Sequence, residues 1–148
     1  MNSPNIAVVG CGQWGQNHVR NLAELEALHT VCDVNSAPLE AIHRQYPHIK
    51  IETEFDKVLL DKQIKGVVLA TPASTHHTLA KAALEAGKDV LIEKPLALRV
   101  EHGELLVKLA AKKGCILMVG HVLCYHPAVI KLKELLENGA LGKVCYIY

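Results

Sequence analysis

Short apolar runs alternate with longer amphipathic segments along the whole chain. The runs are rich in Val and Ile and do not alternate with polar residues, as in Ile6–Val9. Such uninterrupted runs are typical of strands that are buried on both faces of a parallel sheet. The pattern predicts six strands, at residues 6–9, 30–34, 49–51, 67–70, 89–92 and 115–119.

The segments between these runs have helical spacing. Ser36 is expected to cap the second helix and Ser74 or Thr75 the fourth, whereas Gly87 and Gly114 are typical of residues at which helices end. The helices are predicted over residues 14–28, from 36 to before Pro47, 55–60, from 74 or 75 to 86, 100–113 and 127–137.

The helix over residues 100–113 illustrates the expected packing. Leu105, Leu106, Leu109 and Ala110 are predicted to form its inward face. Strands that alternate with helices in this way require a parallel sheet with right-handed crossovers and helices on both faces. The sequence therefore predicts an α/β fold with a doubly wound sheet of the Rossmann type.

One boundary is expected near His121. Residues 1–121 complete the doubly wound unit and are predicted to be a dinucleotide-binding domain. Residues 122–148 add a helix over Pro127–Glu137 and the start of a strand at Val144–Tyr148, which find no partner within the chain. We expect them to be the connecting helix and first strand of a C-terminal substrate domain.

Composition excludes several classes of function. The 148 residues suit one domain, and the net charge of +1 with 4% aromatic residues disfavours binding to nucleic acid or to an anionic membrane. The first residues, Met1–Asn5, lack the basic and apolar regions of a signal peptide. Five cysteines without a CxxC pair argue against a disulfide framework, and we expect a cytoplasmic protein.

A glycine-rich loop follows the first strand. Gly10, Gly12 and Gly15 form a GxGxxG pattern that opens a helix. In this context the first glycine allows a tight turn, the second lets a pyrophosphate approach, and the third lets helix and strand pack closely. Gln13 and Trp14 belong to the same predicted cofactor site, and Trp14 is expected to pack on the first turn of its helix rather than to stack on the substrate. A tight turn without a ligand remains the alternative.

Asp33 ends the second predicted strand, 18 residues after Gly15. An acid at about this position typically binds the ribose hydroxyls of NAD. A phosphate on the ribose would meet this carboxylate, and the following Asn35 and Ser36 supply no compensating cation. The sequence therefore predicts NAD rather than NADP, the alternative being a surface Asp that caps a turn.

Three stretches together resemble the N-terminal domain of the Gfo/Idh/MocA family of oxidoreductases. They are Val9–Gly15, Ala70–His76 and Glu85–Ala97, the last with a Glu-Lys-Pro triplet. The resemblance implies an NAD(P)-dependent enzyme that acts on sugars, cyclitols or nucleotide sugars. It implies that Lys94 binds the substrate hydroxyl and helps to move its proton. It also implies cofactor-site positions for Thr71, Pro72, His76 and Glu93, and leaves the Lys94–Pro95 bond open between cis and trans.

The chain departs from the family pattern at residues 120–128, where many members have an arginine. The version here, with His121 and Tyr125 as candidate substrate contacts, is most similar to nucleotide-sugar enzymes of polysaccharide pathways, such as UDP-N-acetylglucosamine 3-dehydrogenases. The resemblance also implies a second domain and a homo-oligomer for the full-length protein, so that this chain alone would bind NAD without turnover. His121, Cys124 and His126 match no established zinc spacing, and no metal is expected.

The sequence thus predicts the NAD-binding domain of a sugar or nucleotide-sugar dehydrogenase that transfers a hydride. A stand-alone NAD-binding or regulatory module without turnover is the alternative from a different class, and a scaffold domain that has lost its cofactor is a third. A second domain after Tyr148 would distinguish the first of these from the others.

Overall fold

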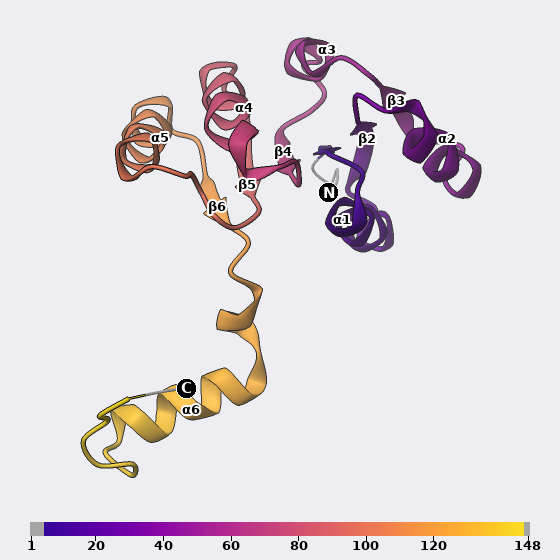
Figure 1. Ribbon diagram of the computed structural model, residues 1–148. Coiled ribbons are helices and arrows are strands. Elements are labelled where there is room, and N and C mark those ends of the chain that lie inside the picture. Colours follow the sequence, from indigo (N-terminus) through magenta and orange to yellow (C-terminus); the bar gives the residue numbers. More distant parts are fainter. Residues whose placement is uncertain (1–4, 147–148) are drawn as a thin grey trace.

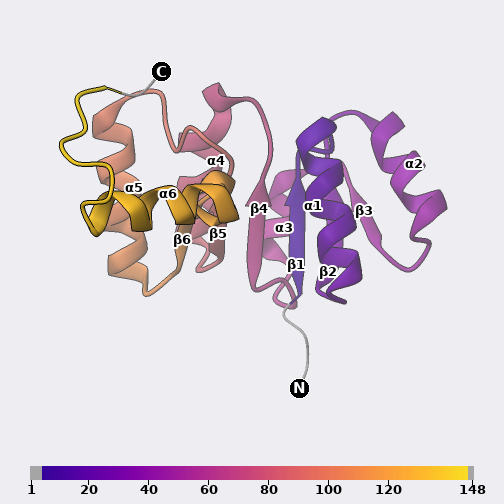
Figure 2. The same cartoon turned by 90° about the horizontal axis from the view of Figure 1, so that it is seen from below.

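A six-stranded parallel sheet forms the centre of the molecule in the computed structural model, which describes residues 5–146 (Figure 1). The strand order is β3-β2-β1-β4-β5-β6, which Figure 2 shows from one edge of the sheet to the other. The strands are β1 (Ile6–Val9), β2 (Leu28–Cys32), β3 (Lys50–Glu52), β4 (Gly66–Leu69), β5 (Asp89–Ile92) and β6 (Leu117–Val119). This order is that of a Rossmann fold and confirms the predicted doubly wound sheet.

Helices cover both faces of the sheet (Figure 1). α3, α4 and α5 lie on one face, and α1 and α2 lie on the other, next to β1, β2 and β3. The helices are α1 (Gln13–Glu24), α2 (Ser36–Gln45), α3 (Phe55–Leu60), α4 (Ala73–Glu85), α5 (Val100–Lys113), the 3-10 helix η1 (Val122–Tyr125) and α6 (Pro127–Glu137).

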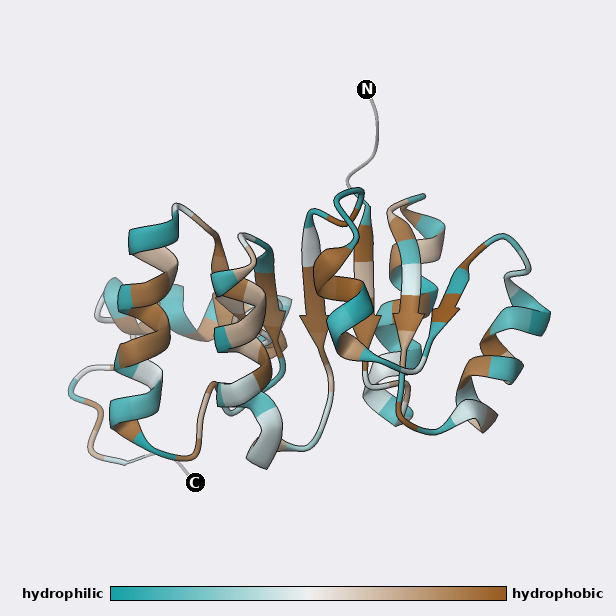
Figure 3. Cartoon of the chain, turned by 90° about the horizontal axis from the view of Figure 1, so that it is seen from above, coloured by the Kyte–Doolittle hydropathy of each residue, from teal (hydrophilic) through white to brown (hydrophobic). Residues whose placement is uncertain are grey.

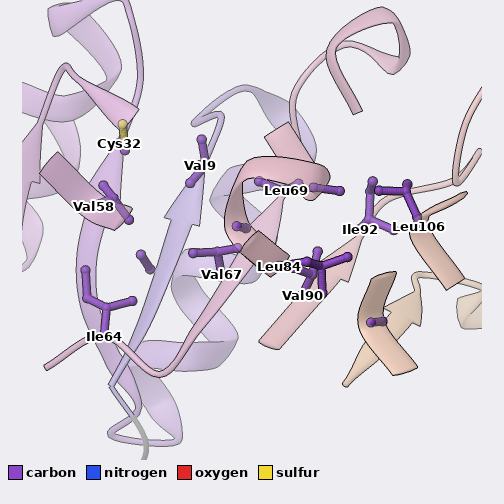
Figure 4. Packing of buried hydrophobic residues seen from close by; sticks show 14 residues of the cluster. Val9, Cys32, Val58, Ile64, Val67, Leu69, Leu84, Val90, Ile92 and Leu106 are labelled. Atoms are coloured by element: carbon purple, nitrogen blue, oxygen red, sulfur yellow. The ribbon is translucent and has the colours of Figure 1, made fainter. Parts of the chain in front are cut away.

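Two hydrophobic clusters hold these layers together. Ala7 and Val9 of β1 belong to one cluster, with Leu84 of α4 and Leu106 of α5 (Figure 4). Val8, which points the other way, belongs to the second cluster with α1 and α2. β1 is therefore buried on both faces, as its unbroken apolar run predicted.

Figure 3 shows hydrophobic strands between helices that carry both hydrophilic and hydrophobic positions. One predicted inward position is wrong: Leu105 of α5 is 56% exposed, whereas Leu106 is buried. At 100° per residue both cannot point into the same narrow contact, and the contact with α4 and the sheet takes Leu106 and Ala110.

The boundary between α1 and β2 also differs from the prediction. α1 ends at Glu24, and β2 begins at Leu28, because Leu28 pairs with Ile6 of β1. Glu26 adopts a left-handed backbone (φ 54°) that breaks the helix between them. Val34, expected in the strand, lies beyond it and is 94% exposed.

Two predicted helix caps are wrong. Asn35 rather than Ser36 caps α2, since its side chain accepts a hydrogen bond from the backbone N–H of Ala37. Pro72 stands at the cap position of α4, and the hydroxyl of Thr75 donates to the Pro72 carbonyl instead of capping the helix. Gly87 and Gly114 have positive φ at the ends of α4 and α5, as predicted.

The chain leaves the sheet after β6. η1 and α6 lie apart from the two covered faces (Figure 1). α6 has the predicted bounds, but residues 144–146 form no strand, and residues 147–148 of the expected strand lie outside the described residues. A strand needs a hydrogen-bonding neighbour, and β6, the nearest edge, lies away from this segment. In the described part of the chain, no helix is long and apolar enough to cross a membrane.

Candidate functional site

A mostly apolar cavity of about 670 Å³ opens at the carboxyl ends of the central strands. It lies between the glycine loop, the end of β2, the start of α3 and the β4–α4 turn. This is the position at which open α/β sheets bind ligands, because strand order reverses between β1 and β4. The lining residues are Val9, Gly10, Gly12, Gln13, Trp14, Cys32, Asp33, Val34, Thr53, Phe55, Ala70, Thr71, Pro72, Thr75 and Leu79.

Gly10 and Gly15 let the glycine loop pack closely. Gly10 has φ +88°, and a Cβ there would lie 2.7 Å from the carbonyl oxygen of Ala70. A Cβ on Gly15 would collide with the backbone carbonyl of Gly10. Gly15 does not line the cavity but lets the first turn of α1 lie against the loop.

Gly12 has a different environment. No described heavy atom lies within 4 Å of the place that a Cβ on Gly12 would take, so the missing side chain leaves open space in the cavity. Gly12 is also the cap residue of α1, and among the described residues no side chain caps that helix and none of its first turn is acidic. Free backbone N–H groups and the positive end of the helix dipole fit the pyrophosphate of a dinucleotide.

Asp33 stands at the opposite side of the same loop. Its Oδ2 accepts a hydrogen bond from the Cys11 backbone N–H at 2.6 Å, and its Oδ1 accepts one from the Asn35 N–H at 2.9 Å. Each carboxylate oxygen can accept a further bond, so the group can bind ribose hydroxyls while it holds the loop.

Thr71 and Pro72 form the wall opposite the glycine loop. The Thr75 hydroxyl donates to the Pro72 carbonyl at 2.8 Å, so the 2.7 Å contact between the two threonine hydroxyls has Thr71 as its donor. The Thr71 oxygen therefore offers only lone pairs to further partners.

Trp14 and Cys11, both next to glycines of the loop, have different environments. Trp14 is 49% exposed and lines the cavity. The Cys11 side chain is not among the residues that line the cavity and is buried in the cluster under α1 and α2. Burial and, next, the nearby Asp33 charge raise the pKa of the Cys11 thiol to about 12, which disfavours a reactive thiolate.

His76 and Glu93, expected at the cofactor site, are buried behind the cavity and are not among its lining residues. The His76 ring lies within hydrogen-bond distance of the carbonyl oxygens of Thr71 (2.9 Å) and Pro95 (2.7 Å). The Glu93 carboxylate lies 2.8 Å from the ring of His18. Nothing in the sequence pattern identified His18.

Lys94 is exposed at the same edge of the sheet. Leu69 of β4 pairs with Ile92 of β5, so Thr71 and Lys94 both stand two residues beyond a paired position on neighbouring strands. The strands of a sheet are about 4.7–4.9 Å apart, so Lys94 leaves the sheet next to the strand that leads to the cavity wall. Its side chain is not among the residues that line the cavity. The Lys94–Pro95 bond is cis.

His121 and Tyr125 reach different places. Val119 of β6 pairs with Ile92, so His121 follows its strand at the same edge as Lys94. Tyr125 is 68% exposed on η1, away from the cavity. Within residues 5–146, no three His, Cys, Asp or Glu side chains cluster as metal ligands.

Sequence reasoning missed part of the lining. Val34, Thr53, Phe55 and Leu79 come from three separate segments, after β2, at the start of α3 and within α4, and line the same cavity. Each reads locally as an ordinary strand-end or helix residue, and only the sheet order brings these segments together.

Comparison with known proteins agrees with this geometry. Residues 4–121 match the family model described as the oxidoreductase family with an NAD-binding Rossmann fold, Gfo/Idh/MocA. The chain is 29% identical to the 2,7-anhydro-N-acetylneuraminate hydratase of Mediterraneibacter gnavus. The match covers the whole of this chain and 39% of that protein. It is 31% identical to the UDP-N-acetylglucosamine 3-dehydrogenase of Acidithiobacillus ferrooxidans, covering 86% of the chain and 40% of that protein. Other relatives are inositol dehydrogenases.

A solved structure gives the same result. The WlbA dehydrogenase of Bordetella pertussis, crystallised with NADH and UDP-GlcNAcA, superposes with a TM-score of 0.88 at 28% identity, over 96% of this chain and 44% of that one. The chain thus spans about two fifths of the length of these relatives. The family match, the strand order and the glycine loop agree. The chain therefore belongs to the Gfo/Idh/MocA oxidoreductase family and contains its NAD-binding Rossmann domain.

Proposed function

We propose that this chain is the cofactor half of an NAD-dependent dehydrogenase that oxidises a hydroxyl of a sugar or nucleotide sugar. The observation that carries the proposal is the strand register: Lys94 and Thr71 each stand two residues beyond the paired positions Ile92 and Leu69, at the edge of the sheet where the cavity opens. The reaction requires a dinucleotide site and a proton-transferring group on one side of the substrate, and this arrangement supplies both.

The chain's residues would bind the cofactor in three parts. The N-terminus of α1 and Gly12 would hold the pyrophosphate, Asp33 the adenosine ribose, and Thr71 and Pro72 the wall toward the nicotinamide. NAD, when bound, supplies the hydride-accepting ring. Gln13 and Trp14 line the same cavity and would shield the bound phosphates from water.

Lys94 would contact the hydroxyl that is oxidised. In its neutral form the amine can take the hydroxyl proton as the carbon loses its hydride, which leaves a carbonyl product. In the reverse direction the ammonium returns the proton. Its exposed side chain leaves this group accessible to a substrate from the open side of the sheet.

Two kinds of relative bear on the substrate class. The GHxxxYxPA stretch and the likeness to two UDP-sugar enzymes favour a nucleotide sugar, whereas the inositol dehydrogenases favour a free cyclitol. His121 is the better placed of the two candidate substrate contacts, because it shares the sheet edge with Lys94. Residues 122–148 would lead into a C-terminal substrate domain, and the full-length protein would be a homo-oligomer.

A stand-alone NAD-binding module is not favoured, because the relatives with named activities are enzymes. The test uses the full-length protein with NAD and a panel of UDP-sugars, free sugars and inositols. Since one relative is a hydratase, the assay follows substrate consumption by mass spectrometry as well as NADH absorbance.

Lys94→Met is the matched variant, with Lys108→Met on the outer face of α5 as its control. We expect Lys94→Met to lower kcat by about 10²–10⁴-fold, the range for loss of a general acid–base, while NADH fluorescence on binding stays within a few fold. Full turnover by Lys94→Met would contradict the role of Lys94. Consumption of every active substrate without NADH formation would contradict the net dehydrogenase reaction.

A further inference from the structure

Lys94 stands between two residues that are each held by a histidine. On one side, the Glu93 carboxylate lies 2.8 Å from His18 Nε2. On the other, the Pro95 carbonyl oxygen lies 2.7 Å from His76 Nδ1. The two histidines belong to different helices on opposite faces of the sheet, so the segment that carries Lys94 is fixed from both sides.

The His18 contact is largely removed from solvent. The side chains of His18 and Glu93 are 19% and 9% exposed. The second carboxylate oxygen of Glu93 accepts a hydrogen bond from the Lys94 backbone N–H at 3.3 Å. A Cβ on Gly120 would lie 3.0 Å from this carboxylate, so the glycine after β6 leaves the space that Glu93 fills.

The carboxylate is therefore confined to one position. An unpaired buried carboxylate would move toward water if it could, and the imidazole of His18 is the group that keeps it in place. Because Glu93 Oε2 accepts the hydrogen bond from the Lys94 N–H, fixing the carboxylate also fixes the Lys94 backbone.

His18 also connects Lys94 to the cofactor site. It lies on α1, whose first residues Gln13 and Trp14 line the cavity. His76, which is 1% exposed, connects the other side to Thr71 of the cavity wall. A displacement of either helix relative to β5 would therefore displace Lys94.

We infer that His18 is a positioning residue for Lys94 that acts through the Glu93 carboxylate, with His76 fixing the same segment at Pro95. The catalytic part of this inference rests on the proposed function, whereas its structural part concerns the Lys94 backbone alone. His18 is not among the residues that line the cavity, so the role inferred for it runs through Glu93.

The test compares two amide replacements of one histidine. In His18→Gln the side-chain amide reaches the position of the imidazole Nε2 and can donate to Glu93, whereas in His18→Asn it falls short. Asn21→Ala, an exposed position on the same helix, is the control. The first readout is the backbone amide signal of Lys94 in the chain labelled with ¹⁵N-lysine, without and with NADH.

We expect the Lys94 amide signal to shift and broaden in His18→Asn and to match the wild type in His18→Gln and Asn21→Ala. The second readout is kcat in the full-length protein. A loss of about tenfold in His18→Asn, with restoration in His18→Gln and a NADH dissociation constant changed less than about threefold, supports positioning.

Two results would overturn the inference. One is an unchanged Lys94 amide in His18→Asn with a lowered melting temperature, which would make the pair a purely structural contact. The other is a displaced Lys94 amide with unchanged kcat. If Lys94→Met keeps full turnover, the proposed function fails, and the amide signal still decides whether His18 positions this segment.

Discussion

The Asp33 carboxylate joins the end of β2 to the glycine loop, because its Oδ2 accepts a hydrogen bond from the Cys11 backbone N–H at 2.6 Å. A residue expected to bind only the cofactor ribose is thus also part of the support of the loop. The position of Gly12 at the cavity therefore depends on a side chain 21 residues further along the sequence.

We predict that the chain binds NAD more tightly than NADP because of this carboxylate. A ribose phosphate beside Asp33 should cost on the order of 1–3 kcal/mol, which is tenfold or more in affinity. Asp33→Asn should remove most of this preference. Calorimetric titration of wild type and variant with both cofactors measures the preference. The control is Asp89→Asn: the Asp89 carboxylate also accepts a backbone hydrogen bond, but it lies at the opposite end of the sheet. Equal affinities in the wild type would disprove the role of Asp33.

The three glycines of the loop should respond differently to alanine. Gly10→Ala forces a side chain into a left-handed backbone and against the Ala70 carbonyl, and we expect a loss of at least about 1–2 kcal/mol of stability. Gly15→Ala should also destabilise the fold. Gly12→Ala should keep the melting temperature and weaken NADH binding, since its methyl group enters open cavity space. Unchanged NADH binding by Gly12→Ala would show that the pyrophosphate lies elsewhere.

Stability should fall in mildly acidic solution because of His77. Its ring stacks on His102 at 4.0 Å between centroids. Burial and, next, the charge of His102 lower the pKa of His77 below its ordinary value of 6.5. The unfolded chain therefore takes up the proton first, and stability is lost as pH falls from about 6.5 through the folded-state pKa.

Urea unfolding of the wild type and of His77→Asn between pH 7.5 and 5 tests this prediction. We expect the free energy of unfolding to change less steeply with pH in His77→Asn. His48→Asn, an exposed histidine in the α2–β3 connection, is the matched control and should keep the wild-type slope. A wild-type slope in His77→Asn as well would assign the effect to other groups.

Lys88 should contribute to stability without affecting the cofactor site. Its ammonium donates to the carbonyl oxygens of Asp61 (2.6 Å) and Ile64 (2.8 Å) before β4, and burial lowers its pKa. Lys88→Met leaves both carbonyls without this donor, at about 1–3 kcal/mol for each buried acceptor. Thermal unfolding should show the loss, whereas Lys62→Met at an exposed position should not. NADH affinity measured well below the melting temperature should stay unchanged, and a weaker affinity would contradict a purely structural role.

Much of this protein follows from the sequence itself. The unbroken apolar runs at β1 and β4 indicated strands buried on both faces, and the helical segments between the strands required a doubly wound sheet. The edge strands β3 and β6 are partly exposed. The glycine loop directly after β1 predicted a dinucleotide site, because the left-handed backbone of Gly10 and the close approach of Gly15 to Gly10 both lie within the loop itself. Four elements have the predicted bounds, namely α3, α5, α6 and β5. At their ends the glycine, polar and apolar residues all indicate the same boundary.

The tertiary structure decided what depends on residues far apart in the chain. Leu28 belongs to β2 rather than to a helix because Ile6 pairs with it, and Leu106 is buried instead of Leu105 because α5 faces α4 and the sheet. The pairing of His18 with Glu93 spans 75 positions, and no local pattern distinguishes either residue from a solvated one. Short-range periodicity determines which elements form, whereas the side chains that hold Lys94 meet only after the strand order brings α1, α4 and β5 to the same edge of the sheet.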